Sequence, residues 1–276
     1  MTRNTAPAPA DLFAAARRCI EATDPDDKMA ATQRAAEAWQ AGELALGEGE
    51  PAAMGEPGRP ARPRLVPPKG LPKRSMHTRE GFAAFLHAVA HIEFNAINLA
   101  WDAVYRFRGL PADYYDDWVR VAAEEAYHFG LVRDRLRELN YDYGDFDAHN
   151  GLWDLARRTA HDHLARMAVI PRGMEARGLD VTPGLIERVR AVGDEATVAI
   201  LEIILRDEIG HVEVGTRWFR HLCEERGADA ETVFAQMTAD YLGRSRGGPF
   251  NTEARRQAGF TDNEMAYLNG LEGSVQ

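Results

Sequence analysis

The sequence predicts an all-α protein organised around an antiparallel four-helix bundle, and two observations lead to this fold class. Apolar residues recur at the 3.6-residue helical period over long segments between residues 78 and 226. No segment shows the two-residue alternation that is typical of a half-buried strand. Because the connections between the helical segments are short or moderate, neighbouring helices are expected to run antiparallel, as two hairpins.

Changes in composition divide the chain of 276 residues into four parts. We expect an N-terminal helical extension over residues 1–48 and a Pro/Arg-rich linker arm over 49–77. The four-helix bundle follows over 78–226, and a C-terminal helical extension covers 227–276. A chain of this length that is 45% hydrophobic suits one domain of moderate size with extensions.

The two parts before the bundle differ in texture. Residues 11–46 are rich in Ala, Glu, Gln and Arg at helical spacing and predict one or two helices, broken around residues 23–26. Residues 49–76 hold seven of the fourteen prolines together with several Arg and Lys, which predicts an extended, polyproline-like arm. The plainer interpretation of this arm is a strap on the acidic body, and the alternative is a contact with nucleic acid or another anion.

The first hairpin of the bundle has clear boundaries. Thr78 is the expected N-cap of a helix that runs through Phe107 and stops at residues 108–111, which include Gly and Pro. The second helix covers about residues 113–139. An acidic and aromatic connection follows it.

The second hairpin is interrupted by prolines. The third helix is expected over about residues 152–177, closing on Gly178, and Pro171 should kink or bulge it just before Glu175. The fourth helix is expected to begin after Thr182-Pro183 and to run to Arg226, with a bend at Gly193. Beyond it we expect a short helix at 230–242, a glycine-rich turn at 247–249 and a last helical stretch toward Leu268.

Charge and composition exclude several classes of protein. The net charge of −10 argues against a protein that coats nucleic acid, so a nucleic-acid partner is not expected. No apolar run approaches the ~20 residues of a membrane span, and the first ten residues lack the layout of a secretion signal. Cys19 and Cys223 have no metal-ligand spacing. Free thiols in a reducing cytoplasm are the simplest expectation.

Two Glu-x-x-His motifs lie in the middle of helical segments. Glu125 and His128 form the first, and Glu208 and His211 form the second. In each motif the carboxylate and the imidazole are one turn apart on one helix face, and both glutamates fall within apolar stripes. A glutamate buried in an apolar stripe is costly unless its charge is compensated. Two such glutamates, each with a histidine beside it, predict a metal site.

Each motif is preceded by a lone glutamate at nearly the same interval. Glu93 lies 125 − 93 = 32 residues before the first motif glutamate, and Glu175 lies 208 − 175 = 33 residues before the second. A dimetal site in a bundle core needs such glutamates from two further helices. His161, Asp162 and His163 compete with Glu175 for its role. The predicted metal ligands are Glu93, Glu125, His128, Glu175, Glu208 and His211.

The chemistry of the six ligands indicates the metal. Four carboxylates offset two divalent ions, and oxygen and nitrogen donors without thiolate favour iron or manganese over structural zinc. We expect two iron ions, with manganese or a mixed pair as alternatives. Glu125 and Glu208 are expected to bridge the ions and to act as the catalytic carboxylates. One metal would be held by Glu93 and His128, and the other by Glu175 and His211.

Several residues lie beside the predicted ligands in the sequence. Glu124 and Asp207 each precede a bridging glutamate and are expected to accept a hydrogen bond from the second N–H of the ligand imidazole. For each, a solvated surface acid is the alternative. His91 lies opposite Glu93 on the same helix and is not expected to bind metal. Gly210 and Gly215 flank the second motif, and either close helix packing or room for oxygen explains them.

With these motifs in place, residues 78–226 resemble the ferritin-like superfamily, which includes ferritins, rubrerythrins, ribonucleotide reductase small subunits and bacterial di-iron monooxygenases. A closer resemblance is to the bacterial family catalogued as domain-of-unknown-function 455. It is carried by the stretches HIEFNAI (91–97), PRGMEARGLD (171–180) and PFNTEARR (249–256). This resemblance implies the dimetal fold and supports Glu175 as a ligand, and it implies no substrate.

The expected function is a dimetal oxidoreductase that activates dioxygen or peroxide and oxidises a small-molecule substrate. The sequence has no Cys-x-x-Cys module, so an external electron donor is required. One alternative is an iron-handling or peroxide-detoxifying protein without an organic substrate, and another is a bundle whose metals only stabilise the core. A third is an enzyme similar to the tRNA-modifying hydroxylase among the ferritin-like enzymes. A homodimer is compatible with the sequence.

Overall fold

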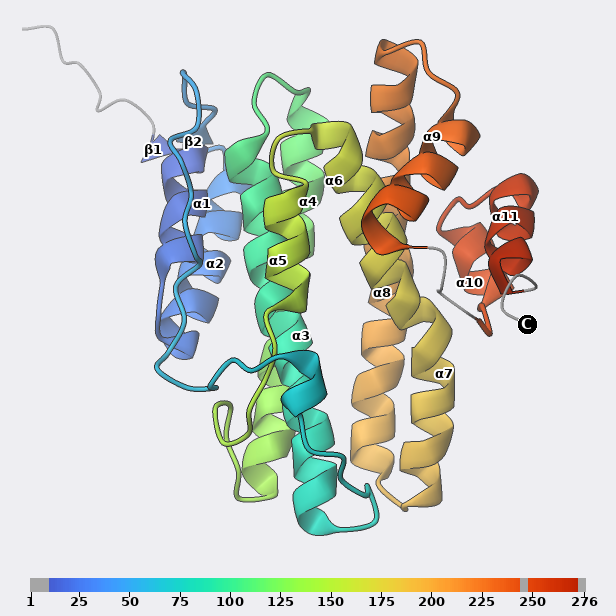
Figure 1. Ribbon diagram of the computed structural model, residues 1–276. Helices are drawn as coiled ribbons and strands as arrows, with labels where there is room; N and C mark the ends of the chain where they lie inside the picture. The colour runs from blue at the N-terminus through green and yellow to red at the C-terminus, as the bar shows by residue number, and fades with distance from the viewer. Residues whose placement is uncertain (1–9, 244–247, 273–276) are drawn as a thin grey trace, which may run out of the picture. The chain divides into compact units, whose positions relative to one another are not determined.

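The computed structural model describes residues 10–243 and 248–272, which form two compact units (Figure 1). Of these residues, the first unit contains 10–66 and 83–148, and the second contains 67–82 and 149–272. The all-helical prediction is confirmed with one small exception. Strands β1 (Ala10–Asp11) and β2 (Leu44–Ala45) pair in parallel, and Leu65 forms an isolated bridge with Ala148. Two-residue strands are too short to show an alternation in the sequence.

The described part of the first unit contains four helices, which are α1 (Leu12–Glu21), α2 (Pro25–Gln40), α3 (Arg79–Arg106) and α4 (Ala112–Glu138). The first four residues of α3 belong to the second unit, and the rest of this helix, from Ala83, belongs to the first. The predicted break between the first two is confirmed. Asp24 accepts a hydrogen bond from Asp26 N at 2.8 Å and caps α2, and Pro25 occupies the first position, where its missing N–H costs nothing. Thr78, the predicted cap of α3, accepts from Gly81 N at 3.1 Å.

A buried lysine joins the N-terminal helices to α3. Lys28 on α2 is completely buried, and its Nζ donates to the carbonyl oxygens of Cys19 and Ile20 at the end of α1, at 2.7 and 2.9 Å. It also donates to Oδ1 of Asn98 on α3 at 2.7 Å. The last carbonyls of a helix lack intrahelical partners, so the ammonium group caps α1. The N-terminal helices therefore share the core of the first unit with α3 and α4.

The first part of the predicted arm is a strap on the first unit. Gly58 N donates to Ile20 O at 2.8 Å, and a Cβ at Gly58 would lie 2.1 Å from Glu21 O. Further along, Arg64 pairs with Asp147, with Nη2 and Oδ2 separated by 2.6 Å. The backbone of residues 49–66 is extended and without helix, as predicted. The rest of the arm, from Pro67, belongs to the second unit and contains the short 3₁₀ turn η1 (Pro68–Gly70).

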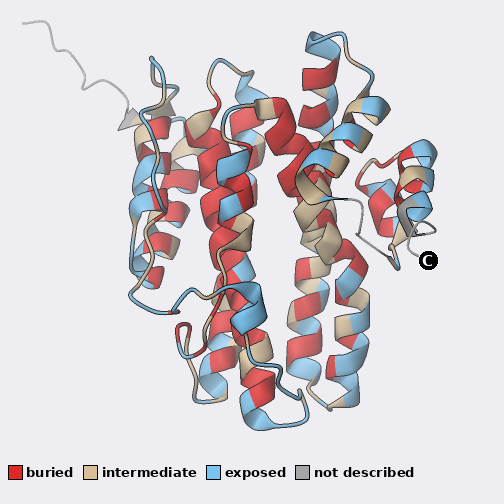
Figure 2. Ribbon diagram, viewed as in Figure 1, coloured by how far each residue is buried: buried red, intermediate tan, exposed pale blue. Residues whose placement is uncertain are grey.

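The second unit contains a succession of helices and two π-helical turns, one of which (η2) carries Glu175. In order they are α5 (Gly151–Arg158), α6 (His163–Val169), η2 (Ile170–Glu175), α7 (Ala176–Ala191), α8 (Glu195–Glu225), α9 (Ala230–Met237), η3 (Thr238–Leu242), α10 (Thr252–Gln257) and α11 (Asp262–Glu272). The buried positions recur at helical spacing along α4 and α8, whereas α3 is buried at every position from Glu93 to Tyr105 (Figure 2). The predicted turn at 247–249 lies partly outside the described residues.

The predicted boundary between the third and fourth bundle helices is wrong. Gly178 does not end a helix, and Pro183 does not begin one, because both lie inside α7. Proline lacks the N–H that would bond to the carbonyl of Leu179 four residues earlier. Asn251 Nδ2 donates to that carbonyl instead, at 3.2 Å, and the helix continues. The chain turns at Gly193, whose φ is +83°.

The predicted continuous helix over residues 152–177 is interrupted. Residues 159–162 separate α5 from α6, and Asp162 caps α6 by accepting from Leu164 N at 3.0 Å. The bulge expected at Pro171 is confirmed as the π-helical turn η2. At this turn Pro171 packs directly on α8, because a Cβ at Gly215 would lie 2.3 Å from Pro171 Cβ. The close packing of Pro171 on α8 therefore explains why residue 215 is a glycine. A Cβ at Gly210 would meet nothing within 4 Å.

Both cysteines lie in the interior of the protein. Cys19 and Cys223 are both buried free thiols. Burial raises the pKa of the Cys19 thiol to about 11, so this group is not a ready nucleophile at neutral pH.

Across residues 10–243 and 248–272, no helix combines the length and the apolar character needed to cross a membrane.

Substitution of the two glycines on α8 should have opposite effects on stability. Gly215→Ala is expected to lower the free energy of unfolding by about 1–3 kcal/mol, because the added methyl group overlaps Pro171. Gly210→Ala, the matched control, should raise it by about 0.5–1 kcal/mol, because alanine favours the helix and meets open space. Thermal and urea unfolding measure both changes. Equal stability of the two variants would contradict the close packing of η2 on α8.

Candidate metal centre

Three of the predicted ligands converge in the core of the first unit. Glu93 extends from α3, and Glu125 and His128 extend from α4. His128 Nδ1 lies 3.6 Å from Glu93 Oε2 and 3.6 Å from Glu125 Oε2. The ligand atoms of the three side chains lie within 4.8 Å of one another. Two atoms that bind one ion at about 2.0–2.2 Å are themselves about 3–4 Å apart, so this spacing suits a shared metal.

The electrostatics of this triad call for a cation. Glu93 is 3% exposed, Glu125 1% and His128 0%, so two carboxylates are held out of water beside one imidazole. Burial lowers the pKa of His128, but the adjacent carboxylates of Glu125 and Glu93 outweigh burial and raise the pKa to about 11. The carboxylates thus stabilise positive charge between them. A divalent ion can supply that charge, with release of the imidazole proton.

The other three predicted ligands belong to the second unit. Glu208 and His211 lie one turn apart on α8, with His211 Nδ1 3.6 Å from Glu208 Oε1. His211 is completely buried, and the side chain of Glu208 is 13% exposed. Glu175 is the last residue of η2 and is half-buried, with its Oε2 inaccessible to solvent. The second unit therefore repeats the Glu-x-x-His arrangement of the first. The joint participation of all six residues in one centre stays a prediction.

The apolar stripes that identified the ligands are buried as expected. On α4 the stripe through Glu125 includes Tyr114, Trp118, Val121, Val132 and Leu136, all of which are buried. On α8 the stripe through Glu208 is likewise buried at Thr197, Leu201, Ile204, Gly215, Trp218 and Leu222. The residues before Glu175 are divided among α5, α6 and η2, so no single helical period leads up to Glu175.

The competitors of Glu175 have other surroundings. Asp162 caps α6 and pairs with Arg226, with Oδ1 and Nη2 separated by 2.7 Å. Burial raises the pKa of Asp162, but Arg226 outweighs burial and holds that pKa below its ordinary value. Burial lowers the pKa of His163 to about 3, and His161 is exposed. Asp162 therefore has a structural role at the start of α6.

The residues that precede Glu125 and Glu208, the two predicted bridging glutamates, are paired with arginines. Glu124 accepts from Arg120 Nη1 at 3.2 Å, and Asp207 accepts from Arg206 Nε at 2.8 Å. Both acids are half-buried. The hydrogen bonds that Glu124 and Asp207 are expected to accept from His128 and His211 stay a prediction.

An aromatic layer beside the triad was not found by sequence reasoning. Tyr143, from the connection after α4, packs on Phe94 and Phe129, with ring centroids 5.0 and 5.3 Å apart. Phe94 follows Glu93 in the chain, and Phe129 follows His128. Tyr143 also hydrogen-bonds His91, whose Nδ1 lies 2.8 Å from the phenol oxygen. His91 therefore has a packing role, in keeping with its expected absence from the metal ligands. The run Tyr-Asp-Tyr-Gly at residues 141–144 was its only signal.

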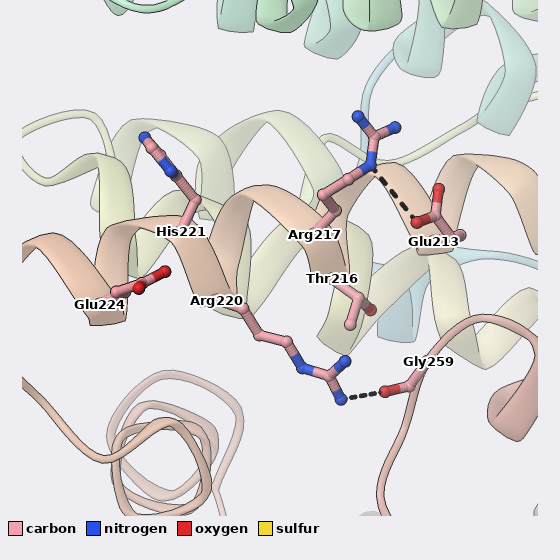
Figure 3. Close-up of a pocket in the computed structure, with 7 residues that line it drawn as sticks. All are labelled: Glu213, Thr216, Arg217, Arg220, His221, Glu224 and Gly259. Carbon is pink, nitrogen blue, oxygen red and sulfur yellow. Dashed lines mark hydrogen bonds and ion pairs between the residues drawn. The ribbon is translucent and has the colours of Figure 1, made fainter.

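A surface groove of about 370 Å³ lies along α8 in the second unit (Figure 3). It is lined by residues from Glu213 to Glu224 and by Gly259. Arg217 pairs with Glu213, and Arg220 donates to the carbonyl of Gly259. The groove includes none of the predicted ligands, and its acidic and basic groups balance. It is therefore not a candidate for the metal centre.

Comparisons with known proteins cover most of the chain. A family model described as "Protein of unknown function (DUF455)" matches residues 21–266. An uncharacterized protein of Haemophilus influenzae (strain ATCC 51907 / DSM 11121 / KW20 / Rd) is 50% identical over 224 residues, which are 79% of this chain and 78% of the relative. No solved structure gives a significant match. The residues matched by the family model include all six predicted ligands, and the two descriptions name no metal or reaction.

Metal binding should depend on the predicted ligands and not on neighbouring residues of the same type. With about two ions bound per wild-type chain, Glu125→Ala and Glu208→Ala should each lower the occupancy sharply, because each removes a bridging carboxylate. His91→Ala and Glu213→Ala, which remove a packing imidazole and an exposed glutamate on α8, should leave it unchanged. Metal analysis after anaerobic purification measures the occupancy. Equal loss in all four variants would contradict the ligand assignment.

Proposed function

The chain belongs to the DUF455 family of proteins of unknown function, and we propose that it is a ferritin-like dimetal carboxylate oxidoreductase that activates dioxygen or peroxide to oxidise a substrate. The observation that carries the proposal is the buried triad of Glu93, Glu125 and His128 in the first unit. Two carboxylates and an imidazole at this spacing, out of contact with water, form a donor set for a transition-metal ion.

The second half of the centre is inferred from the internal repeat. Glu175, Glu208 and His211 repeat the residue types of the triad, and the intervals of 32 and 33 residues match. The pair on α8 repeats the 3.6 Å imidazole–carboxylate distance found in the first unit. Together the six side chains give four negative charges, which balance two divalent ions. The absence of thiolate from this set supports iron or manganese.

The protein's own contribution is to hold the ligands, to exclude water and to control their protonation. When bound, a pair of iron or manganese ions supplies electrons and Lewis acidity for the reduction of dioxygen or peroxide. His128 and His211 are completely buried, and each must be neutral, with one ring nitrogen unprotonated, to act as a ligand. Glu93, Glu125 and His128 are at most 3% exposed, and exclusion of water strengthens the electrostatic interactions among them. Electrons for turnover come from a separate donor, because Cys19 and Cys223 form no redox motif.

Oxygen exposure of the iron-loaded protein tests the proposal. Protein purified without oxygen and loaded with ferrous iron should change its near-ultraviolet and visible absorption when oxygen is admitted, because iron held by carboxylates and imidazoles is oxidised. The Glu125→Ala variant, treated in the same way, should show a much smaller change. Bound iron with no spectral change would show that the metals only stabilise the core.

Gel filtration of the same sample separates this function from iron storage. The oxidoreductase should elute as a small particle that takes up about two ions per chain. A cage-sized particle that accumulates many ions per chain would contradict the oxidoreductase and support an iron-handling protein. The two measurements together distinguish catalysis, storage and structural metal binding.

A further inference from the structure

The C-terminal part of the second unit binds the segment that carries Glu175. Residues 251–264, which include α10 and the start of α11, contact residues 172–180, which include the end of η2 and the start of α7. The contacts consist of two buried arginine–carboxylate pairs and several hydrogen bonds to backbone groups. Glu175 lies between the two pairs along the chain.

The first pair is formed by Arg172 and Glu264. Arg172 lies on η2, three residues before Glu175, and is completely buried. Its Nη2 donates to both carboxylate oxygens of Glu264, at 2.7 and 2.8 Å, and its Nε donates to Thr216 Oγ1 on α8 at 3.2 Å. Three rings surround the guanidinium carbon at 4.4–4.6 Å, those of Phe219, Phe234 and Phe260. Aromatic faces stabilise a guanidinium that is removed from water.

Glu264 is held in place by hydrogen bonds at the N-terminus of α11. Glu264 N donates to Thr261 Oγ1 at 3.1 Å, and Thr261 N donates to Glu264 Oε2 at 2.9 Å. This reciprocal pair is a capping box at the N-terminus of α11. One carboxylate thus caps α11 and binds Arg172 at the same time. The position of α11 and that of η2 are therefore coupled through a single side chain.

The second pair is formed by Arg255 and Asp180. Arg255 donates from Nε and Nη2 to the two oxygens of Asp180, at 2.8 and 2.7 Å. Its Nη2 also donates to the carbonyl of Ala176, the residue that follows Glu175, at 3.3 Å. Asn251 N donates to Asp180 Oδ1 at 3.0 Å, and Asn251 Nδ2 donates to the Leu179 carbonyl that Pro183 leaves open. Both sides of Glu175 are thus held by residues 251–264.

A π-helical turn with a proline needs such external contacts. The π-helix is rare, and Pro171 removes a backbone hydrogen bond within the turn. Replacing a buried ion pair by apolar residues is often neutral for stability, so packing alone does not require Arg172 and Glu264. Their directional bonds fix the rotation of the turn, in addition to the packing of Pro171 on α8.

We propose that residues 251–264 form part of the metal centre, because Glu264 and Arg255 hold η2 and α7 so that Glu175 is positioned to bind metal. The inference rests on the proposed function, which makes Glu175 a ligand. Arg172, Asp180, Arg255 and Glu264 are positioning residues in this scheme, and none of them touches the metal. The C-terminal segment then sets the affinity of the ion that Glu175 holds.

A double-mutant cycle with manganese(II) as the probe tests the proposal on the full-length chain. Glu175→Ala and Glu264→Gln should each weaken manganese binding by about 10–100-fold, because each removes or misplaces the same ligand. The double variant should bind no more weakly than Glu175→Ala, because Glu264 acts only through Glu175. Arg226→Gln is the matched control, since it breaks the Asp162 pair elsewhere in the second unit and should keep wild-type affinity. Titration followed by electron paramagnetic resonance gives the affinities.

The outcomes separate the two proposals. A wild-type chain that binds no manganese and no iron overturns the proposed function and the positioning role with it. Wild-type binding that is lost in Glu175→Ala but kept in Glu264→Gln overturns the positioning role alone. Additive losses in the double variant also overturn it, because they show a general structural effect. If Glu264→Gln does not fold, Asn251→Ala takes its place in the cycle with the same expected results, since it removes the side-chain contacts to Leu179 and Ala254 but no buried charge.

Discussion

Two carboxylates buried beside one imidazole impose the main constraint on the first unit. Glu93 and Glu125 cannot both remain ionised in the core unless positive charge lies between them. This requirement explains the raised pKa of His128 and the close approach of α3 and α4, which bring the three side chains together.

The second unit meets a related requirement with long-range contacts. Glu175 lies on a turn that local helical propensity does not favour, and neighbouring elements fix its geometry. Pro171 packs on α8 where Gly215 has no side chain, while Arg172 and Asp180 bind residues that follow much later in the chain. In the first unit, by contrast, Glu125 and His128 lie on a regular helix, so that their mutual geometry follows from the helical period alone.

The features that depend on periodicity were predictable, and those that depend on distant partners were not. The helices α3 and α4, the buried stripes through Glu125 and Glu208, and the bulge at Pro171 follow from local patterns. The end of the third helix was misplaced because Thr182-Pro183 is a strong local signal for a helix start. That signal is overridden by Asn251, which satisfies the open carbonyl of Leu179 from 72 residues away. The role of Tyr143 likewise depends on contacts that no sequence period encodes.

The pair between Arg172 and Glu264 has a consequence for the order of folding during synthesis. The two residues are separated by 92 positions, so Arg172 emerges from the ribosome long before its partner exists. Until then an arginine destined for the interior stays hydrated, and the turn around it lacks its anchor. The second unit therefore completes its folding only after the N-terminus of α11 has been translated. During that interval Phe219 is already made, and Phe260, which also packs on Arg172, is not.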